Sequence, residues 1–306
     1  MANNKEALHN FGSSSLTLSA AIESGDADAL RDLLKAGRSP DEYEWDAGTT
    51  PLIQATEKRN LEAMRILLKY RATISKKHKD GYTAIHVASV IGFLKGLELL
   101  SSYGGDLTEP DKDNLTPLVL AASEGHVNVV HYLFHISRSS NSPCSSSPVT
   151  PLVIAAIRNK IDVVEFLLHA EDKSAYSLSE LNQALLQATI LGHEEVVRAL
   201  LEHTADPNYK QDLPPIHAAI QKGHHNILLL LCNHDANFEI RDKRGFTPLM
   251  TACFERNLPA VKYLLEIGAN VKASARNGKY TPLKIARRAK VPEIVQLIES
   301  ALETKF

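Results

Sequence analysis

Residues 245–257 read GFTPLMTACFERN, in which Gly, an aromatic residue, Thr and Pro precede a run of small and apolar residues. Similar stretches occur at 81–92 (GYTAIHVASVIG), at 114–125 (NLTPLVLAASEG) and at 279–290 (KYTPLKIARRAK). A catalytic motif normally occurs once in a chain. A motif that returns at a fixed interval indicates a repeated unit of architecture.

The position held by Thr247 recurs along the chain with a period near 33 residues. The aligned residues are Leu16, Thr50, Thr83, Thr116, Thr150, Gln183, Pro214, Thr247 and Thr281, and successive members lie 31 to 34 residues apart. A period of this length is typical of a solenoid built from stacked units. About nine units would fill residues 14–306 and leave residues 1–13 as an N-terminal tail.

Each unit carries the signals of two helices. The recurring Thr can cap a helix N-terminus, and the Pro that follows it in six units suits the first helical position. Small residues come next, and a Gly that can end the helix follows in several units. A second helix is then predicted from apolar stripes such as VNVVHYLF at 127–134 and EEVVRALL at 194–201.

With these features in place, the chain resembles the ankyrin-repeat family. The residues that carry the resemblance are Thr-Pro-Leu at 50–52, 116–118, 150–152, 247–249 and 281–283, the following His at His86 and His217, Gly-His at 125–126, 192–193 and 223–224, TADPN at 204–208 and GANV at 268–271. The resemblance implies an all-α solenoid of paired antiparallel helices. It also implies β-hairpin or loop fingers that project from one edge.

Three stretches depart from this pattern. The first unit has Leu16 and Ser19 where the family favours Thr and His, and the sixth opens NQALL without Thr or Pro. Residues 137–148 read SRSSNSPCSSSP, a Ser-rich insertion that we expect to be mobile and open to phosphorylation. Polar residues in the first and last units suggest capping repeats, so we expect a complete array that is an elongated monomer.

Composition and motifs argue against several other classes of protein. Apolar residues make up 44% and charged residues 23%, which is typical of a folded chain, and no apolar run has the length of a signal peptide or membrane span. The three cysteines are few and widely spaced, which favours a reducing compartment. We expect a cytoplasmic location, with the nucleus as the alternative.

No motif for catalysis or phosphate binding is recognisable, so we expect no enzymatic activity and no cofactor. The chain has 13 histidines, most of them at repeat positions with a structural role. His131 and His135 have the spacing of metal ligands on a helix, but the sequence places no further ligand beside them. Partly exposed helix histidines are therefore the favoured interpretation, and no metal site is predicted.

In this family, residues that vary at the finger tips, just before the Thr and at the end of the first helix line a concave groove. The candidates here are Tyr43, Trp45, Tyr82, Val90, Ile91, Leu115, Ile157, Leu191, Arg244, Phe246, Phe254, Lys279 and Tyr280. Aromatic side chains are enriched among the residues that dominate interface energies. Packing against a neighbouring finger is the alternative role for these side chains.

Charge is distributed unevenly along the chain. Residues 1–50 have a net charge of −5, from four basic and nine acidic residues, whereas residues 241–290 have +9, from twelve basic and three acidic residues. The basic end favours an acidic segment of a protein partner.

The leading prediction is a non-catalytic adaptor, scaffold or stoichiometric inhibitor. The alternatives are a substrate-recruiting subunit of a ubiquitin ligase, binding of a nucleotide or nucleic acid at the basic end, and an effector delivered into a host cell. Nucleic acid is the less favoured ligand because no nucleic-acid-binding module is recognisable.

Overall fold

The computed structural model describes residues 17–42, 48–139, 149–170, 177–209 and 212–303. In these ranges the chain forms 18 helices and no strand, which confirms the predicted all-α class. The helices are α1 (Leu18–Ser24), α2 (Ala27–Lys35), α3 (Pro51–Glu57), α4 (Leu61–Lys69), α5 (Ala84–Val90), α6 (Leu94–Ser102), α7 (Pro117–Glu124), α8 (Val127–Ser139), α9 (Pro151–Ile157), α10 (Ile161–His169), α11 (Leu178–Leu191), α12 (Glu194–Glu202), α13 (Pro215–Lys222), α14 (His225–Asn233), α15 (Pro248–Phe254), α16 (Leu258–Glu266), α17 (Pro282–Ala289) and α18 (Pro292–Glu303).

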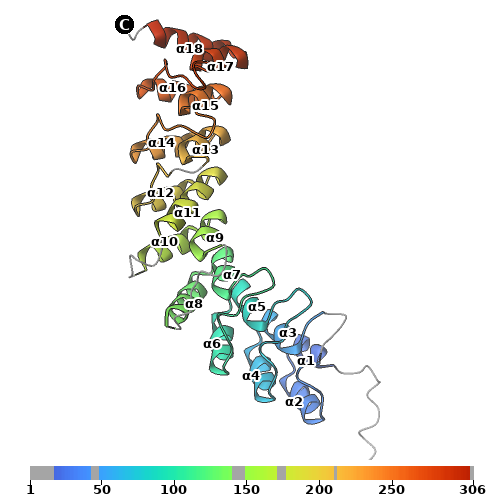
Figure 1. The fold of residues 1–306 in the computed structure, drawn as a ribbon. Helices are drawn as coiled ribbons and strands as arrows, with labels where there is room; N and C mark the ends of the chain where they lie inside the picture. The colour runs from blue at the N-terminus through green and yellow to red at the C-terminus, as the bar shows by residue number, and fades with distance from the viewer. Residues whose placement is uncertain (1–16, 43–47, 140–148, 171–176, 210–211, 304–306) are drawn as a thin grey trace, which may run out of the picture. The chain divides into compact units, whose positions relative to one another are not determined.

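The chain divides into two compact units, one of residues 1–121 with 131–143 and the other of residues 122–130 with 144–306. In the first unit, α3 packs between α1 and α5, and α4 packs between α2 and α6. In the second unit, α9, α11, α13, α15 and α17 form one row, and α10, α12, α14, α16 and α18 form the other (Figure 1). Each repeat contributes one helix to each row.

The helix signals in the sequence act as predicted. The side chains of Thr50, Thr150, Thr247 and Thr281 each accept a hydrogen bond from a backbone N–H in the first turn of the following helix. A proline begins each of α3, α7, α9, α13, α15 and α17. Gly192 and Gly223 end α11 and α13 in the left-handed conformation, at φ 85° and 75°. Local sequence therefore sets the boundaries of most helices.

In two repeats the first helix does not begin at the aligned position. The cap of α1 is Thr17 and not Leu16, because the Thr17 hydroxyl accepts from the N–H of Ala20. The helix of the sixth repeat begins at Leu178, ahead of the aligned Gln183. Its cap is Ser177, which exchanges hydrogen bonds with Glu180. A Ser-x-x-Glu capping box therefore replaces Thr-Pro in this repeat.

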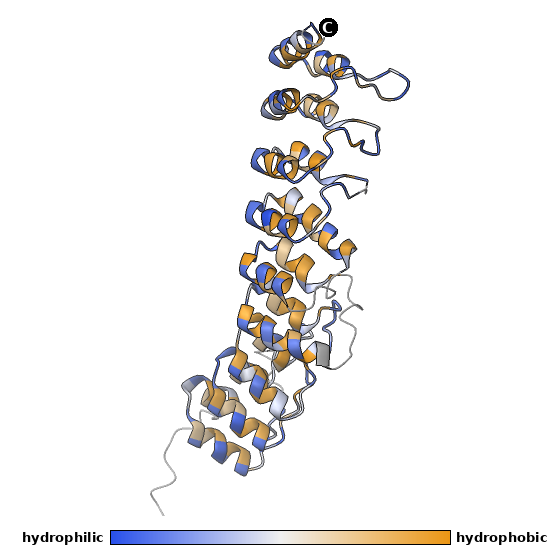
Figure 2. Cartoon of the chain, turned by 90° about the vertical axis from the view of Figure 1, so that its left-hand side faces the viewer, coloured by the Kyte–Doolittle hydropathy of each residue, from blue (hydrophilic) through white to orange (hydrophobic). Residues whose placement is uncertain are grey.

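The core lies between the two rows of helices and between successive repeats. Leu185, Leu200, Leu231 and Leu264 are fully buried there. Hydrophobic and hydrophilic residues alternate along most helices, as an amphipathic pattern requires (Figure 2). Burial of the hydrophobic face against two neighbouring repeats is what holds each helix pair in the stack.

His86 and His217, each three residues after the recurring Thr or Pro, have a structural role, as the sequence predicts. The Nε2 atom of His217 donates to the carbonyl of Ile240 over 2.9 Å, and Nδ1 accepts from the hydroxyl of Thr251 over 2.9 Å. The Nε2 atom of His86 likewise donates to the carbonyl of Glu109 over 3.0 Å. Each ring ties its helix to the base of the next finger.

The described fingers are loops closed by a few hydrogen bonds. The N–H of Asp242 donates to the carbonyl of Phe246 over 3.0 Å, and Asp111 with Leu115 repeats this contact over 2.9 Å. An isolated bridge joins Ala275 to Tyr280. The fingers therefore keep the register of a hairpin without forming a strand.

Candidate partner-binding site

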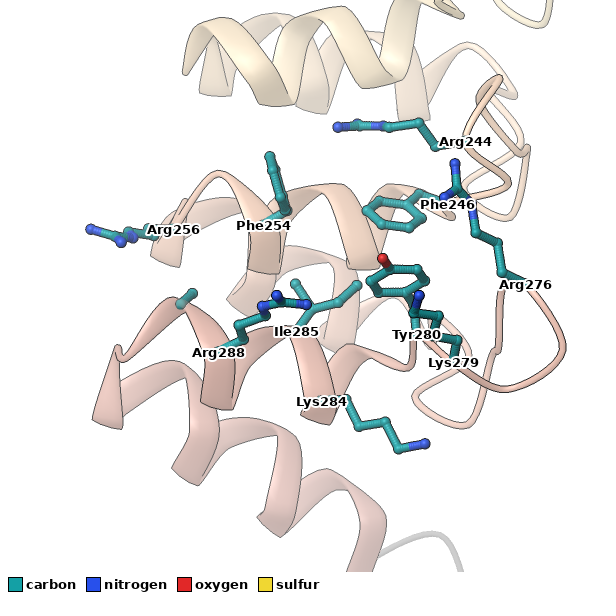
Figure 3. Close-up of a pocket in the computed structure, with 11 residues that line it drawn as sticks. Arg244, Phe246, Phe254, Arg256, Arg276, Lys279, Tyr280, Lys284, Ile285 and Arg288 are labelled. Carbon is teal, nitrogen blue, oxygen red and sulfur yellow. The ribbon is translucent and has the colours of Figure 1, made fainter.

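A hollow of about 600 Å³ opens on the C-terminal unit (Figure 3). Four segments form it: the finger before α15, the C-terminal end of α15, the finger before α17, and α17 itself. We call this hollow the C-terminal pocket. It is lined by Arg244, Phe246, Phe254, Arg256, Arg276, Lys279, Tyr280, Lys284, Ile285, Arg288 and Ala289. No acidic residue belongs to this described lining.

Three aromatic rings form the apolar part of the C-terminal pocket. The Phe246 ring centre lies 5.4 Å from that of Tyr280 and 6.2 Å from that of Phe254, at angles of 58° and 64°. These are the tilted and edge-to-face arrangements that aromatic rings favour. Phe246 is only 5% exposed, whereas Phe254 is 52% exposed. Phe246 is thus part of the base, and Phe254 presents an open ring.

Arg244 is held in place at one side of the pocket. Its Nε donates to Oδ2 of Asp242 over 2.7 Å, and the Asp242 side chain is only 2% exposed. The guanidinium carbon lies 4.8 Å from the ring centre of Phe246 and 5.3 Å from that of Phe254. Its Nη2 atom is buried and has no hydrogen-bond partner among the described residues. A fixed cation with one unused donor therefore borders the aromatic rings.

The two fingers beside the pocket are joined directly. The Nη1 atom of Arg241 donates to the carbonyl of Gly245 over 2.8 Å and to that of Ser274 over 2.9 Å. The first carbonyl lies in the finger before α15 and the second in the finger before α17. This bridge holds the two fingers at a fixed separation, and with them the residues that they contribute to the site.

Five further cations surround the pocket: Arg256, Arg276, Lys279, Lys284 and Arg288. Within the described part of the chain, none of them forms an ion pair. The charges of Arg276 and Lys279 lie 5.9 Å and 5.8 Å from the Tyr280 ring centre. The neighbouring Arg287, by contrast, is paired with Glu299 over 2.7 Å. The charges of these five side chains are therefore not compensated by an ion pair with any described residue.

The structure brings together five of the residues predicted from sequence: Arg244, Phe246, Phe254, Lys279 and Tyr280. Rings on both sides and the Arg244 guanidinium cover Phe246, which is the packing role that the sequence left open for this side chain. The remaining lining residues lie in the basic stretch 241–290 but were not among the predicted site residues: Arg256, Arg276, Lys284, Ile285, Arg288 and Ala289. Arg256 stands after the first helix of its repeat, where five other repeats have Gly, and it has the positive φ of that place, 59°. A cationic side chain at this place was the available signal.

The other predicted residues lie elsewhere. Tyr82, Val90, Ile91 and Leu115 are half-buried in the first unit, where the Tyr82 ring stacks on His86 at 5.8 Å. In the second unit Ile157 is half-buried and Leu191 is 46% exposed. Tyr43 and Trp45 lie outside the described residues, as does most of the Ser-rich stretch 137–148, of which 137–139 complete α8. Partner binding by all these residues stays a prediction.

The described ranges contain no side-chain cluster that fits a metal ion and no thiol with a lowered pKa. No three His, Cys, Asp or Glu side chains there are grouped to hold a metal ion, and the rings of His131 and His135 contact each other at 4.5 Å. Burial raises the pKa of the Cys253 thiol to about 12 and also raises the pKa of Cys232, so both thiols are protonated at neutral pH. Helices in the same ranges are too short or too polar to cross a bilayer.

Comparison with known proteins gives one consistent family. A family model described as ankyrin repeats (3 copies) matches residues 18–111, 74–143, 92–177, 136–211, 185–275 and 216–303. "Ankyrin repeat, SAM and basic leucine zipper domain-containing protein 1" of Notamacropus eugenii is 37% identical over 119 residues, which are 37% of this chain and 25% of that protein. "B-cell lymphoma 3 protein homolog" of Mus musculus is 28% identical over 131 residues, 43% of this chain and 28% of that protein.

A third relative, "Ankyrin repeat and SOCS box protein 11" of Mus musculus, is 36% identical over 86 residues, which are 28% of this chain and 25% of that protein. The chain thus spans about a quarter of the length of these relatives. The matches to the family model together run from residue 18 to residue 303, which is nearly the whole chain. This chain belongs to the ankyrin-repeat family.

Proposed function

We propose that this chain is a non-catalytic protein–protein interaction module whose last two repeats bind an acidic segment of a partner protein. Membership of the ankyrin-repeat family supports the general role of protein binding. The observation that carries the specific role is the C-terminal pocket, in which six cations surround three aromatic rings without a lining carboxylate.

Electrostatics supports an anionic ligand. Like charges that share a concave surface raise one another's energy, and field lines concentrate in such a hollow. Five of the six cations lack an ion-pair partner among the described residues, so a bound carboxylate would gain attraction without displacing an internal pair. A partner with clustered Asp or Glu side chains would also associate faster, because opposite charges steer the encounter.

The aromatic rings explain why a protein segment suits the pocket better than a small inorganic anion. Phe254 is half exposed, and Tyr280 and Ile285 continue the apolar surface toward α17. An apolar side chain next to an acidic residue can cover these groups while the carboxylate meets the cations. Such pairing of aromatic anchors with a charged rim is typical of interface hot spots.

Fluorescence anisotropy with a labelled polyglutamate peptide tests the proposal. Wild-type protein should bind it, and the double variant Arg256→Ala with Arg288→Ala should bind roughly tenfold more weakly. Arg287→Ala is the matched control, because Arg287 neighbours Arg288 on α17 but is engaged by Glu299 outside the pocket. Equal binding by the double variant and the control would show that the pocket is not the acidic-peptide site.

The same anisotropy measurement with a labelled oligothymidylate of similar net charge tests the nucleic-acid alternative. A nucleic-acid site should prefer the oligonucleotide, with log affinity falling linearly as log salt rises. Tighter binding of the oligonucleotide than of polyglutamate at the same salt concentration would overturn the proposal in favour of nucleic acid. The expected result is the opposite order.

A further inference from the structure

We propose that the C-terminal pocket receives a phosphotyrosine side chain of the partner segment. This inference rests on the proposed function and makes its ligand more specific. Both proposals require an anion on a peptide. The phosphotyrosine inference also requires that this anion be doubly charged and carried on an aromatic ring.

The amount of charge favours a phosphate over a single carboxylate. A carboxylate carries one negative charge, whereas a phosphate monoester carries about −1.5 to −2 at neutral pH and three strong acceptor oxygens. Arg256, Arg276, Lys279, Lys284 and Arg288 lie around one hollow of about 600 Å³ and lack ion-pair partners in the described ranges. One carboxylate would leave most of this charge unopposed, and a phosphate opposes more of it at a single point.

Arg244 supplies a donor that is already oriented. Asp242 fixes its Nε at 2.7 Å, and the Phe246 ring lies against the guanidinium at 4.8 Å, so little side-chain entropy remains to be lost on binding. The Nη2 atom is buried yet has no hydrogen-bond partner among the described residues. A buried donor left unpaired costs free energy, and an acceptor oxygen on a ligand would remove that cost.

The aromatic part of the pocket favours a ring between the peptide backbone and the phosphate. Phe254 keeps 52% of its surface exposed although Phe246 lies 6.2 Å from it. A planar ring on the ligand can pack against Phe254 and Tyr280 in an offset or edge-to-face arrangement. Phosphoserine has only one methylene before its phosphate, so it would leave these rings exposed. Figure 3 shows the Arg244 and Arg288 guanidinium groups on either side of the rings, whereas the Arg256 side chain points away from them.

Four labelled peptides test the inference. They share glutamate and glycine flanks and differ at one central residue, which is glutamate, tyrosine, phosphoserine or phosphotyrosine. The phosphotyrosine peptide should bind wild-type protein roughly tenfold or more tightly than each of the other three. Phenyl phosphate should also compete for the site at lower concentration than inorganic phosphate, because only phenyl phosphate carries the ring.

Phe254→Ala separates the ring contact from the charge contact. It should abolish most of the preference for phosphotyrosine over phosphoserine, because only the phosphotyrosine peptide carries a ring that can pack on Phe254. Tyr103→Ala is the matched control, since Tyr103 is an aromatic residue with 48% exposure in the first unit. Unchanged preference in Phe254→Ala would overturn the placement of the ligand ring.

The outcomes also separate this inference from the proposed function. If the glutamate, phosphoserine and phosphotyrosine peptides bind equally, the acidic-segment function stands and the phosphotyrosine inference is wrong. If the phosphoserine and phosphotyrosine peptides are equal and both exceed glutamate, the pocket recognises phosphate without the ring, which also overturns the inference. If none of the peptides binds, both proposals fail together.

Discussion

Arg244 and Asp242 form an ion pair of 2.7 Å in which the carboxylate is almost completely buried and the guanidinium is partly exposed. Asp242 also accepts from the backbone N–H groups of Arg244 and Phe246, each over 2.9 Å. One carboxylate therefore closes the finger, positions the ring of Phe246 and orients the cation of the C-terminal pocket. In the aligned finger of the fourth repeat, Asp111 makes the same backbone contacts, but its Oδ2 has no partner among the described residues.

Asp242→Ala should destabilise the protein and weaken peptide binding. The substitution leaves two backbone donors and the Arg244 Nε without their acceptor, which should lower the free energy of unfolding by about 2 kcal/mol. Urea unfolding followed by circular dichroism measures the stability, and anisotropy measures the binding.

Asp242→Asn separates the two effects. The amide oxygen can still accept from the backbone N–H groups, while the charge that orients Arg244 is removed. We expect a smaller loss of stability than in Asp242→Ala together with a clear loss of peptide affinity. Lys243→Ala, next in the same finger and 68% exposed, is the control. If Asp242→Asn binds peptide as well as wild type does, Asp242 does not act through Arg244.

Truncation of the two phenylalanines of the pocket should change the free energy of unfolding by very different amounts. Phe246→Ala removes a ring that is 5% exposed and should cost about 3 kcal/mol or more in stability. Phe254→Ala removes a ring that is 52% exposed and should change stability by only about 0.5 kcal/mol. Thermal melting of both variants checks this order. A larger shift for Phe254→Ala would mean that the burial of the two rings has been assigned the wrong way round.

Much of the fold was predictable because each repeat signals its own boundaries. Thr247 followed by Pro248 fixes the start of α15, and similar pairs recur at the same period. The exception at Gln183 arose because a capping box at Ser177 and Glu180 starts the helix earlier. Periodicity located the unit correctly, whereas only the local hydrogen bonds show where its helix begins.

The candidate site was predicted only in part. A repeat position tells where a residue stands along its unit, and from this Arg244, Phe254 and Tyr280 could be chosen. It does not tell which side chain of the next repeat covers it, so the sequence left open whether Phe246 packs against a neighbouring finger, and the structure shows that it is only 5% exposed. Arg256 was missed because its place in the repeat usually belongs to a helix-ending Gly, which has no side chain to bind a partner.

Two buried histidines should make the protein less stable in mild acid. Burial lowers the pKa of His217 below its usual value, with Asp242 opposing and Arg244 adding to the effect, and burial likewise lowers the pKa of His86. The unfolded chain then takes up protons near pH 6.5 that the folded chain binds less readily. This contribution to stability is therefore full above about pH 7. It falls as the pH drops from the unfolded-chain pKa near 6.5 to the lowered pKa of the folded chain, by at most about 1.4 kcal/mol per pH unit for each histidine, and levels off below the lowered pKa.

The urea midpoint at about pH 7.5 and about pH 5.5 measures this dependence. His217→Gln should be less stable than wild type at the higher pH, because its contact with Ile240 is altered, but it should lose less on acidification. His234→Gln is the control, since His234 is half-buried at the C-terminal end of α14. Equal acid sensitivity of wild type and His217→Gln would exclude a contribution from His217.

A ladder of hydrogen bonds links the second-unit repeats and breaks at the last junction. The side chains of His193, His224 and Asn257, each just before the second helix of its repeat, donate to the carbonyls of Ile157, Ile190 and Ile220 in the preceding repeat. The aligned residue in the last repeat is Val291, whose side chain has no hydrogen-bond donor. The C-terminal pocket lies across this same junction.

Val291→Asn should therefore stabilise the last repeat. Asn257 shows both contacts that the new side chain could make, because its Nδ2 donates to Ile220 over 3.0 Å and its Oδ1 accepts from Ala260 over 3.1 Å. Asn is among the best residues at a helix N-terminus and Val among the poorest, so α18 should gain about 1 kcal/mol. Hydrogen exchange of the α18 amides should slow accordingly. Val291→Ala provides neither contact, and if it slowed exchange as much as Val291→Asn, the missing hydrogen bonds would not be what limits the stability of this repeat.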